Sequence, residues 1–172
     1  SIQYRGTRGE QNWSLSLEHP ARVTVVVPLR ARKILSVAVN GQAATWTEEP
    51  GLGCTRVCIE SDASNIDVVL KFEPQERTDA DTTALSSDVG QAIQLEAGDH
   101  GIESFLDPQG VFATAEISDA CISAVVAPNP GHHLVLAQVR VGDLPQWRCF
   151  KICVSDPVAE AAEVARTVTA PG

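Results

Sequence analysis

The residues best suited to chemistry lie close together near the end of the sequence. They are a histidine pair, a tryptophan and two cysteines: His132, His133, Trp147, Cys149 and Cys153. A histidine held against a thiol is the arrangement of nucleophilic catalysis, in which the thiolate attacks and the imidazole moves the proton. Histidine and cysteine are also common ligands of zinc. The indole ring adds a third chemistry, because it stacks on the apolar face of a sugar ring.

These residues fall on two alternating segments joined by turn formers at 142–143, a pattern typical of a β-hairpin. In the second segment the apolar residues alternate: Phe150, Ile152 and Val154. Trp147 therefore points to the opposite face, together with Lys151 and the two cysteines. A hairpin with alternating faces does not by itself hold a base against a thiol. We interpret these residues as part of a sheet rather than as a catalytic pair.

Metal binding and hydrolysis are the other enzymatic interpretations of the sequence. Pairing of the two segments brings His133 towards Cys153, but further ligands would have to come from loops such as Asp99-His100. The sequence contains no nucleophile elbow, phosphate loop, dinucleotide fingerprint or EF-hand pattern. Its carboxylates fall at turns or on solvated strand faces rather than as a pair across a cleft. We predict no catalytic residue, metal ligand or cofactor, and keep a small metal-dependent enzyme as a third alternative.

Three tryptophans are the candidate ligand-binding residues: Trp147, Trp46 and Trp13. Each lies in or beside a predicted strand, where an indole ring either packs in a core or forms a platform for a sugar. Trp46 alternates with Ala44, and the neighbouring strand decides which side of that segment is buried. A tryptophan on an outer face is a platform if it is bare, and a packing residue if a neighbouring module covers it. We favour packing and keep the platform as the alternative.

The composition restricts the class of protein and its partners. With 44% hydrophobic and 20% charged residues, the chain of 172 residues has the composition of a globular protein. The formal net charge of −9 argues against nucleic acid as a partner, because phosphate binding requires a basic face. No run approaches the roughly 18 to 20 apolar residues that span a bilayer, so we predict no membrane partner. The absence of methionine predicts that the sequence begins inside a longer polypeptide, with any signal peptide outside it.

The five cysteines leave at least one thiol without a partner inside the chain. Two pairs have three residues between them, in CTRVC (54–58) and CFKIC (149–153). Four residues of a strand cover about 13 Å, whereas the Cα atoms of a disulfide lie within about 7 Å. Neither pair therefore bridges internally while its strand is straight. Disulfide bonds between different strands stay open as alternatives. The cysteines therefore do not decide whether the chain lies in an oxidising or a reducing compartment.

Short strand-like runs separated by turn formers fill most of the sequence. Residues 1–75 form the first module, in which Asn40-Gly41 is the strongest turn, because this pair suits the positive φ angles of a type I′ hairpin. In the run before this turn, the more apolar face carries Leu35, Val37 and Val39. The segment 76–88 is charged and rich in threonine and serine, which is typical of a linker.

Residues 89–155 resume the strand pattern and form the second module. Its short strands, with no amphipathic helix between them, are typical of an immunoglobulin-like sandwich. The end of the chain, 156–172, is a linker or a short helix with Ser155 or Asp156 as its N-cap, and we favour the linker. The fold class that we predict is all-β, with two tandem antiparallel β-sandwich (immunoglobulin-like) modules.

Both modules resemble parts of one class of protein. The first contains ARVTVVVPLRARKILSVAVNGQAATW and CTRVCIESDASNIDVVLKFEP, and it resembles the accessory β-sandwich of bacterial proteins of the six-hairpin glycosidase type. The second contains FLDPQGVF (105–112) and GHHLVLAQVRVGDLPQW (131–147), and it resembles a companion immunoglobulin-like module of such proteins. The resemblance covers most of residues 11–154. It implies that a catalytic domain, if there is one, lies outside this segment.

The expected function follows from this pattern and this resemblance. We expect a non-catalytic accessory segment of a larger carbohydrate-active bacterial protein, which supports the catalytic domain or contacts glycan. The partners implied are a polysaccharide or oligosaccharide and neighbouring domains of the same polypeptide, and the location implied is extracytoplasmic. The alternative is a protein-interaction or adhesion module, which recruits another chain through a sheet face or edge.

Overall fold

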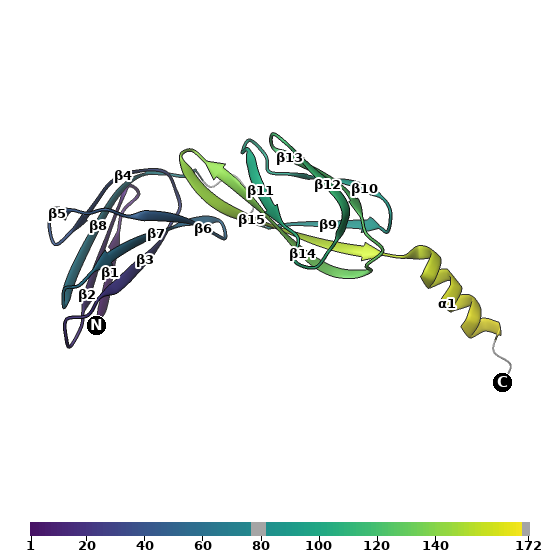
Figure 1. The fold of residues 1–172 in the computed structure, drawn as a ribbon, viewed down its shortest axis with the longest axis horizontal. Helices are drawn as coiled ribbons and strands as arrows, with labels where there is room; N and C mark the ends of the chain where they lie inside the picture. Colours follow the sequence, from purple (N-terminus) through teal and green to yellow (C-terminus); the bar gives the residue numbers. More distant parts are fainter. Residues whose placement is uncertain (77–81, 170–172) are drawn as a thin grey trace. The chain divides into compact units, whose positions relative to one another are not determined.

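The computed structural model describes residues 1–76 and 82–169. Within these ranges the chain forms fifteen strands, β1 to β15, followed by one helix, α1 (Figure 1). The prediction of an all-β fold is confirmed. Among the described residues, no helix is both long enough and apolar enough to cross a membrane.

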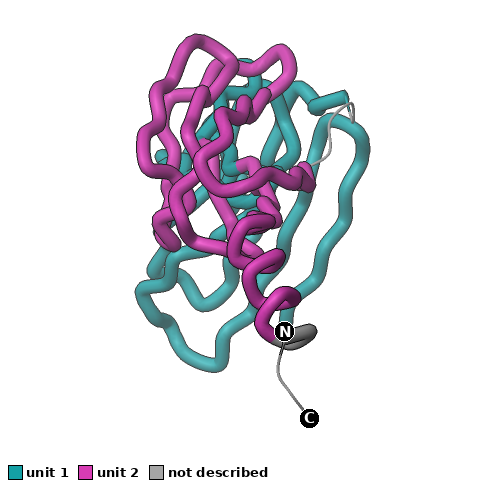
Figure 2. The backbone as a smooth tube through the Cα atoms, turned by 90° about the vertical axis from the view of Figure 1, so that its right-hand side faces the viewer, with its two compact units in different colours: residues 1–79, 138–147 teal, residues 80–137, 148–172 magenta. Residues whose placement is uncertain are grey.

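The chain divides into two compact units, which Figure 2 shows in different colours. Unit 1 consists of residues 1–79 and 138–147, and unit 2 consists of residues 80–137 and 148–172. The division differs in one respect from the expected modules at 1–75 and 89–155. Residues 138–147, expected in the second module, belong to unit 1, because they pack on its core.

Unit 1 contains two sheets. The first has five strands in the order β1-β2-β8-β4-β5, with the bounds Ile2–Gly6, Glu10–Ser16, Asn65–Pro74, Ala31–Val39 and Gln42–Ala43. The second has three strands in the order β3-β7-β6, with the bounds Val23–Leu29, Cys54–Ser61 and Thr47–Gly51. The strands of both sheets pair antiparallel.

Alternation along β3, β7 and β8 builds the core of unit 1. In these strands buried side chains alternate with more exposed ones, as expected when one face of a sheet covers a core. Side chains of both sheets join in one buried cluster, whose fully enclosed members include Leu29, Val57, Ile59, Ile66, Val68 and Leu70. The apolar surface removed from water here is the main favourable contribution to the folding of this unit.

Strand β4 does not follow simple alternation. Its buried residues are Ala31, Ile34 and Val37, three positions apart, because its pairing with β8 contains two register shifts of the kind that β-bulges produce. An extra residue in one strand reverses the side to which the following side chains point. The prediction that Leu35 shares the buried face with Val37 is therefore wrong, and the Leu35 side chain is 56% exposed.

The turn between β4 and β5 is the one predicted at Asn40-Gly41. Both residues have positive φ, 51° for Asn40 and 79° for Gly41, as a type I′ turn requires. The Asn40 side chain also holds the start of β8, because its Oδ1 accepts a hydrogen bond from the Asp67 amide at 2.8 Å. Strand β5 ends at Ala43, so Trp46 lies outside the predicted hairpin strand, in the connection to β6.

The turn of the hairpin formed by β14 (Gly131–Val141) and β15 (Leu144–Ser155) belongs to unit 1. The Leu144 side chain is enclosed in the core cluster of this unit. The buried Thr55 hydroxyl on β7 donates a hydrogen bond to the Pro145 carbonyl at 2.8 Å. Apolar packing and a buried hydrogen bond therefore hold the start of β15 on β7.

Unit 2 also contains two sheets. The first has the order β10-β13-β12, with the bounds Ala92–Glu96, Cys121–Val126 and Phe112–Ser118. The second has the order β11-β14-β15-β9, in which β11 spans Ile102–Leu106 and β9 spans Thr82–Asp88. The β15–β9 pair is parallel, so the expectation of antiparallel pairing does not hold for this pair.

The segment predicted as a linker, 76–88, is a strand from Thr82 onwards. Residues 77–81 of that segment lie outside the described residues. The linker prediction fails for 82–88 because β9 lies at the edge of its sheet, where small polar side chains tolerate solvent. A strand that buries few side chains lacks the apolar periodicity by which strands are recognised in a sequence.

The core of unit 2 draws on both of its sheets. Its buried apolar side chains include Leu95, Ile122, Val126, Val135, Phe150, Ile152 and Val154. The predicted apolar face of the last strand, at 150, 152 and 154, is thus confirmed. Phe105 and Phe112 pack edge to face, with their ring centroids 6.2 Å apart, a favourable arrangement for two aromatic rings.

The chain continues after β15 as helix α1 (Pro157–Thr169). Asp156 is its N-cap, because Asp156 Oδ1 accepts a hydrogen bond from the Ala159 amide at 3.0 Å. Pro157 occupies the first helical position, where its missing N–H is not needed. Of the two expectations for 156–172, the short helix is observed over 157–169 rather than the favoured linker, and 170–172 lie outside the described residues.

Candidate functional site

A hollow lies on the four-stranded sheet of unit 2, over β9, β14 and β15. Its volume is about 610 Å³, which is within the range of small-molecule sites in proteins. We call it the β9–β14–β15 hollow. Its lining residues are Ala84, Leu85, Ser86, Gln109, His132, His133, Leu134, Lys151, Ile152 and Cys153.

The alternation of the strands decides which of these side chains face the hollow. On β14 the His132 side chain is exposed and that of His133 is buried. On β15 the Lys151 side chain is exposed and that of Cys153 is half-buried. The parallel pairing of β15 with β9 sets Ser86 beside Cys153. The hollow therefore presents an imidazole, an ammonium, a thiol and a hydroxyl group on neighbouring strands.

The neighbouring His133 points to the opposite face of β14 from His132 and Leu134, and its ring is buried. It is 7% exposed, and its Nε2 lies 2.8 Å from the Asn129 carbonyl oxygen. Because a carbonyl oxygen only accepts, Nε2 carries a proton. The other ring nitrogen, Nδ1, is buried and has no hydrogen-bond partner in the described part of the chain. Unpaired buried polar atoms are rare in native proteins, because each costs free energy.

The loop between β11 and β12 closes one end of the hollow. The Gln109 Oε1 atom accepts a hydrogen bond from the Leu134 amide at 2.7 Å, and the Gln109 carbonyl accepts one from Asn129 Nδ2 at 3.0 Å. Since Asn129 also accepts from His133, these residues form one connected network. A connected network of this kind keeps the wall in one arrangement.

Cys153 lines the hollow together with His132 and His133. Within residues 1–76 and 82–169, its sulfur forms no hydrogen bond to either ring, whereas activation of a thiol requires a base at hydrogen-bond distance. The other cysteine considered with the histidines, Cys149, is buried and is not a lining residue. The described residues contain no group of three or more His, Cys, Asp and Glu side chains that could hold a metal ion. None of the five cysteines, all within the described ranges, forms a disulfide bond.

The candidate Trp13 lies on β2 in unit 1 and is partly exposed. Trp13 packs against the core of that unit, and its Nε1 donates a hydrogen bond to Gln11 Oε1 at 3.2 Å. It also contacts the Tyr4 ring on β1, with the ring centroids 4.4 Å apart and the planes inclined by 41°. Tyr4 also lines a smaller hollow of about 330 Å³ on the β1–β2 pair, which sequence reasoning did not find.

The candidates Trp46 and Trp147 also belong to unit 1 and are partly exposed. Trp46 packs against the core, and its Nε1 donates a hydrogen bond to Glu48 Oε1 at 3.1 Å. Trp147 lies beside Leu52, and its carbonyl accepts a hydrogen bond from the Gly53 amide at 2.9 Å. None of the three tryptophans is among the residues that line the β9–β14–β15 hollow.

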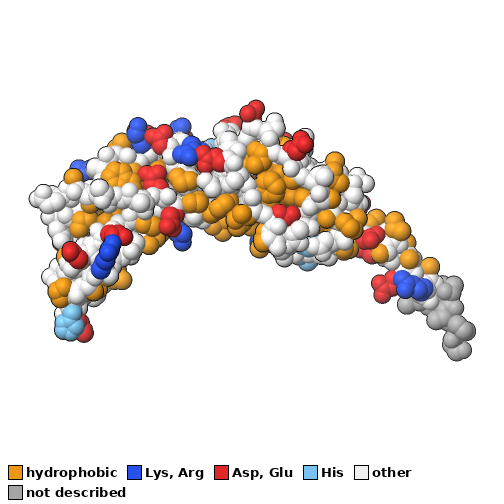
Figure 3. Space-filling model, viewed as in Figure 1, with side chains coloured by type: hydrophobic (Ala, Val, Ile, Leu, Met, Phe, Trp, Pro, Cys, Tyr) orange, Lys and Arg blue, Asp and Glu red, His pale blue; other side chains and the backbone are white. Residues whose placement is uncertain are grey.

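Ion pairs on unit 1 join exposed side chains of opposite charge. They include Arg22–Glu60 at 2.7 Å, Lys33–Asp143 at 3.6 Å and Lys71–Glu10 at 4.0 Å. The hydrogen bond from Arg22 to Glu60 raises the pKa of the Arg22 guanidinium. On the face drawn in Figure 3, basic side chains lie among acidic ones. Lys151 in the hollow differs, because the described residues provide no ion-pair partner for it.

Two residues of the hollow were beyond sequence reasoning. Ser86 falls in the predicted linker, and only the parallel pairing of β9 with β15 brings it to Cys153. Gln109 falls in a turn, and only its bond to the Leu134 amide places it at the hollow. Alternation along the last strand, in contrast, predicts that Lys151 points outward, and the structure agrees.

No family model matches the chain, and neither a curated protein nor a solved structure is similar to it. The resemblance to accessory modules of six-hairpin glycosidases therefore stays a hypothesis that depends on sequence patterns. The function of the chain has to be inferred from the geometry of its own residues.

Proposed function

We propose that this chain is a non-catalytic accessory segment of a larger carbohydrate-active bacterial protein, which supports a catalytic domain or contacts glycan. We also propose that each unit is a β-sandwich and that unit 2 is immunoglobulin-like. The arrangement of the strands supports the second statement, and the β9–β14–β15 hollow supports the first.

The strand order of unit 2 fits an immunoglobulin-like sandwich. Named A to G in chain order, β9 to β15 form sheets with the orders B-E-D and C-F-G, as in constant-type domains. The first strand pairs with G rather than with B, which is a departure from that pattern. A fold of this kind serves many functions, so the function is argued from the hollow.

The hollow itself is the observation that carries the proposal. Its polar groups come from three strands and one loop, and they stand beside the apolar side chains of Ala84 and Leu134. Such a mixture matches a sugar ring, which has hydroxyl groups around its edge and apolar C–H faces. The paired carboxylates that hydrolyse glycosidic bonds are not among the lining residues. The hollow therefore suits contact with glycan rather than its cleavage.

Affinity electrophoresis of the whole chain, in gels that contain neutral or acidic polysaccharides, tests the contact role. We expect at least one polysaccharide to retard the protein. Ser86→Trp should abolish the retardation, because the new indole fills the hollow from an exposed position on β9. Thr24→Trp is the matched control, at an exposed position on β3 of unit 1, and should keep it.

Two results would contradict the contact role. The first is that no polysaccharide retards the protein, which leaves support of a neighbouring domain as the proposed function. The second is that Ser86→Trp is retarded as strongly as the unmodified chain, which places any glycan contact outside the hollow.

A second function is favoured by a different surface of unit 2. The sheet β10-β13-β12 carries a hollow of about 590 Å³ lined in part by the small, exposed side chains Ala92 and Ser123. Its edge strand β12 bears Ile117, which is 40% exposed. Because an uncovered strand edge can pair with a strand of another chain, the alternative is a protein-interaction or adhesion module.

The molecular mass in solution tests this alternative. A specific oligomer, lost in Ile117→Lys, would favour it, since a charge at the strand edge opposes pairing. A monomer at every concentration, with the same mass in the presence of neighbouring domains, would contradict it.

A further inference from the structure

Strand β1 is an edge strand of the five-stranded sheet of unit 1, where it pairs with β2. In this pairing Tyr4 lies opposite Trp13, so the two rings point to the same face of the sheet. Trp13 packs against the core of the unit, whereas Tyr4 is 52% exposed. The core therefore extends outward through two aromatic layers, first the indole ring and then the phenol ring, and the second layer meets solvent.

The two rings form a stack rather than a side-by-side pair. Their centroids are 4.4 Å apart and their planes are inclined by 41°. At this separation two aromatic rings overlap. One side of the Tyr4 ring therefore rests against the indole of Trp13. Because half of Tyr4 is exposed, its other side is open to solvent.

Two neighbours on the same face of the sheet hold the stack in place. Gln11 lies opposite Gly6 in the ladder, and its Oε1 accepts the hydrogen bond from Trp13 Nε1 at 3.2 Å, which sets the direction of the indole. The phenol ring extends over Gly6, because a Cβ added to this glycine would lie 2.8 Å from Tyr4 Cζ. The absence of a side chain at Gly6 therefore provides the space for the ring.

We propose that the exposed face of Tyr4 is a stacking platform for a neutral pyranose ring of a glycan chain. The inference rests on the proposed glycan contact and adds a second contact, in unit 1, to that of the hollow. A pyranose ring has a face of C–H groups that packs on an aromatic ring, while the hydroxyl groups at its edge form hydrogen bonds. The side-chain amide of Gln11, opposite Gly6, donates to one of these hydroxyl groups.

The chain contains a single tyrosine, so a ¹³C label in tyrosine reports on Tyr4 alone. We expect cellotetraose, which consists of pyranose rings, to shift the ring resonances of Tyr4. Saturation of the Tyr4 ring protons should also reach the C–H groups of the sugar. The matched ligand is arabinofuranotetraose, which is neutral and equally long, but whose furanose rings lack a broad C–H face. It should leave the resonances in place.

Three results of this experiment overturn the platform. The first is an unchanged Tyr4 resonance at the highest concentration of cellotetraose. The second is an equal shift with both sugars. The third is a shift that follows the protein concentration without any sugar, because a second copy of the chain then covers the ring.

Isothermal titration of variants of the whole chain with cellotetraose tests the ring itself. Tyr4→Ala should weaken binding roughly fivefold, which is the size of one aromatic stacking contact. Tyr4→Phe keeps the ring and should keep the affinity. Leu35→Ala is the matched control, since it removes a side chain of unit 1 that is 56% exposed, and should also keep the affinity. Equal losses in Tyr4→Ala and Leu35→Ala overturn the proposal, because any exposed apolar group then contributes.

Gly6→Ala tests the placement of the ring. The added Cβ requires the space of the phenol ring, so the ring moves aside while the chain keeps its tyrosine. We expect a loss of affinity close to that of Tyr4→Ala and a displaced Tyr4 resonance in the free protein. Gly101→Ala is the matched control, because no atom lies within 4 Å of its added Cβ. Full affinity in Gly6→Ala overturns the proposed binding mode.

Failure of this inference is distinguishable from failure of the proposed function. Gel retardation that Ser86→Trp abolishes and Tyr4→Ala leaves unchanged keeps the contact at the hollow and overturns the platform. Retardation that Tyr4→Ala weakens and Ser86→Trp leaves unchanged keeps the platform and overturns the contact at the hollow. Absence of retardation by any polysaccharide, with no shift of the Tyr4 resonance, overturns both contacts.

Discussion

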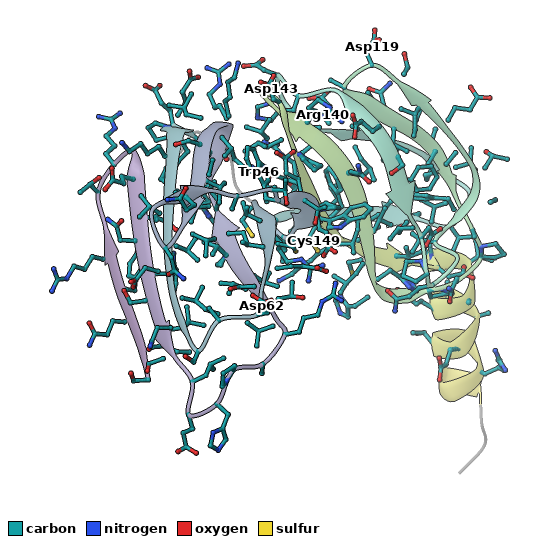
Figure 4. The ribbon with its side chains drawn as sticks, turned by 60° about the vertical axis from the view of Figure 1, so that its left-hand side comes forward. Trp46, Asp62, Asp119, Arg140, Asp143 and Cys149 are labelled. Carbon is teal, nitrogen blue, oxygen red and sulfur yellow. The ribbon has the colours of Figure 1, made fainter. Side chains whose placement is uncertain are left out.

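The amide of Asp143 donates a hydrogen bond to the carbonyl of Arg32, with a nitrogen–oxygen distance of 2.8 Å. Both residues belong to unit 1, although more than a hundred positions separate them in the sequence. Arg140 Nη1 donates to the Asp143 carbonyl at 2.9 Å, and the two residues lie together at the hairpin turn in Figure 4. The turn is thus fixed both to its own strand and to β4.

Gly142→Ala should destabilise unit 1 strongly. Gly142 has a φ of +63°, and an added Cβ would lie 2.3 Å from the Arg32 carbonyl oxygen, a backbone atom that cannot move aside. We expect a loss of about 3 kcal/mol or more in the free energy of unfolding, measured by urea denaturation. Gly41→Ala is the control, because its φ is +79° and no atom lies within 4 Å of the added Cβ. The control should lose only about 1–2 kcal/mol, and equal losses would contradict the close approach.

Ile34→Ala and Leu35→Ala should differ sharply, because the register shifts in β4 bury the first side chain and expose the second. Ile34 is 9% exposed, whereas Leu35 is 56% exposed. We expect about 2–5 kcal/mol of destabilisation for Ile34→Ala and about 0.5 kcal/mol for Leu35→Ala, measured by thermal and urea unfolding. Greater destabilisation by Leu35→Ala would indicate plain alternation along β4.

Asn40→Ala should destabilise the β4–β5 turn in two ways. It places an alanine at a φ of 51°, and it removes the bonds from the Asp67 amide and to the Asn65 carbonyl. We expect a loss of about 2–3 kcal/mol in the free energy of unfolding. Asn40→Gly separates the two contributions, because glycine adopts positive φ without strain. A glycine variant as stable as the unmodified chain would show that the side-chain bonds contribute nothing.

Asp156→Ala should loosen helix α1 without unfolding the sheets. Asp156 Oδ1 accepts from the Ala159 amide, and the side chains of residues 157–166 are exposed. We expect faster hydrogen exchange at the first turn of α1, a change of about 1 kcal/mol in local stability, and an unchanged urea midpoint for the sheets. Asp156→Ser should restore slow exchange, since serine is also an N-cap. Unaltered exchange in the alanine variant would contradict the cap.

The candidate site was only partly accessible to sequence reasoning. The outward direction of Lys151 follows from the period of a strand, which is a local property. The position of Ser86 beside Cys153 depends on a parallel pairing between segments more than sixty residues apart, and no local pattern encodes such a pairing. The unpaired Nδ1 of His133 depends on where the Asn129 carbonyl lies, which only the folded chain determines.

The local chemistry of the sequence determined the all-β class, the positive-φ turn at Asn40-Gly41 and the buried face of β15. These features depend on residues that are neighbours in the chain, because side-chain alternation and backbone sterics act over a few positions. Tertiary structure alone decided the register shifts of β4, the strand at 82–88 and the place of the hairpin turn on unit 1. Each of these depends on which distant segments pair. The free energy of strand pairing comes from contacts between the two segments, so neither sequence alone determines it.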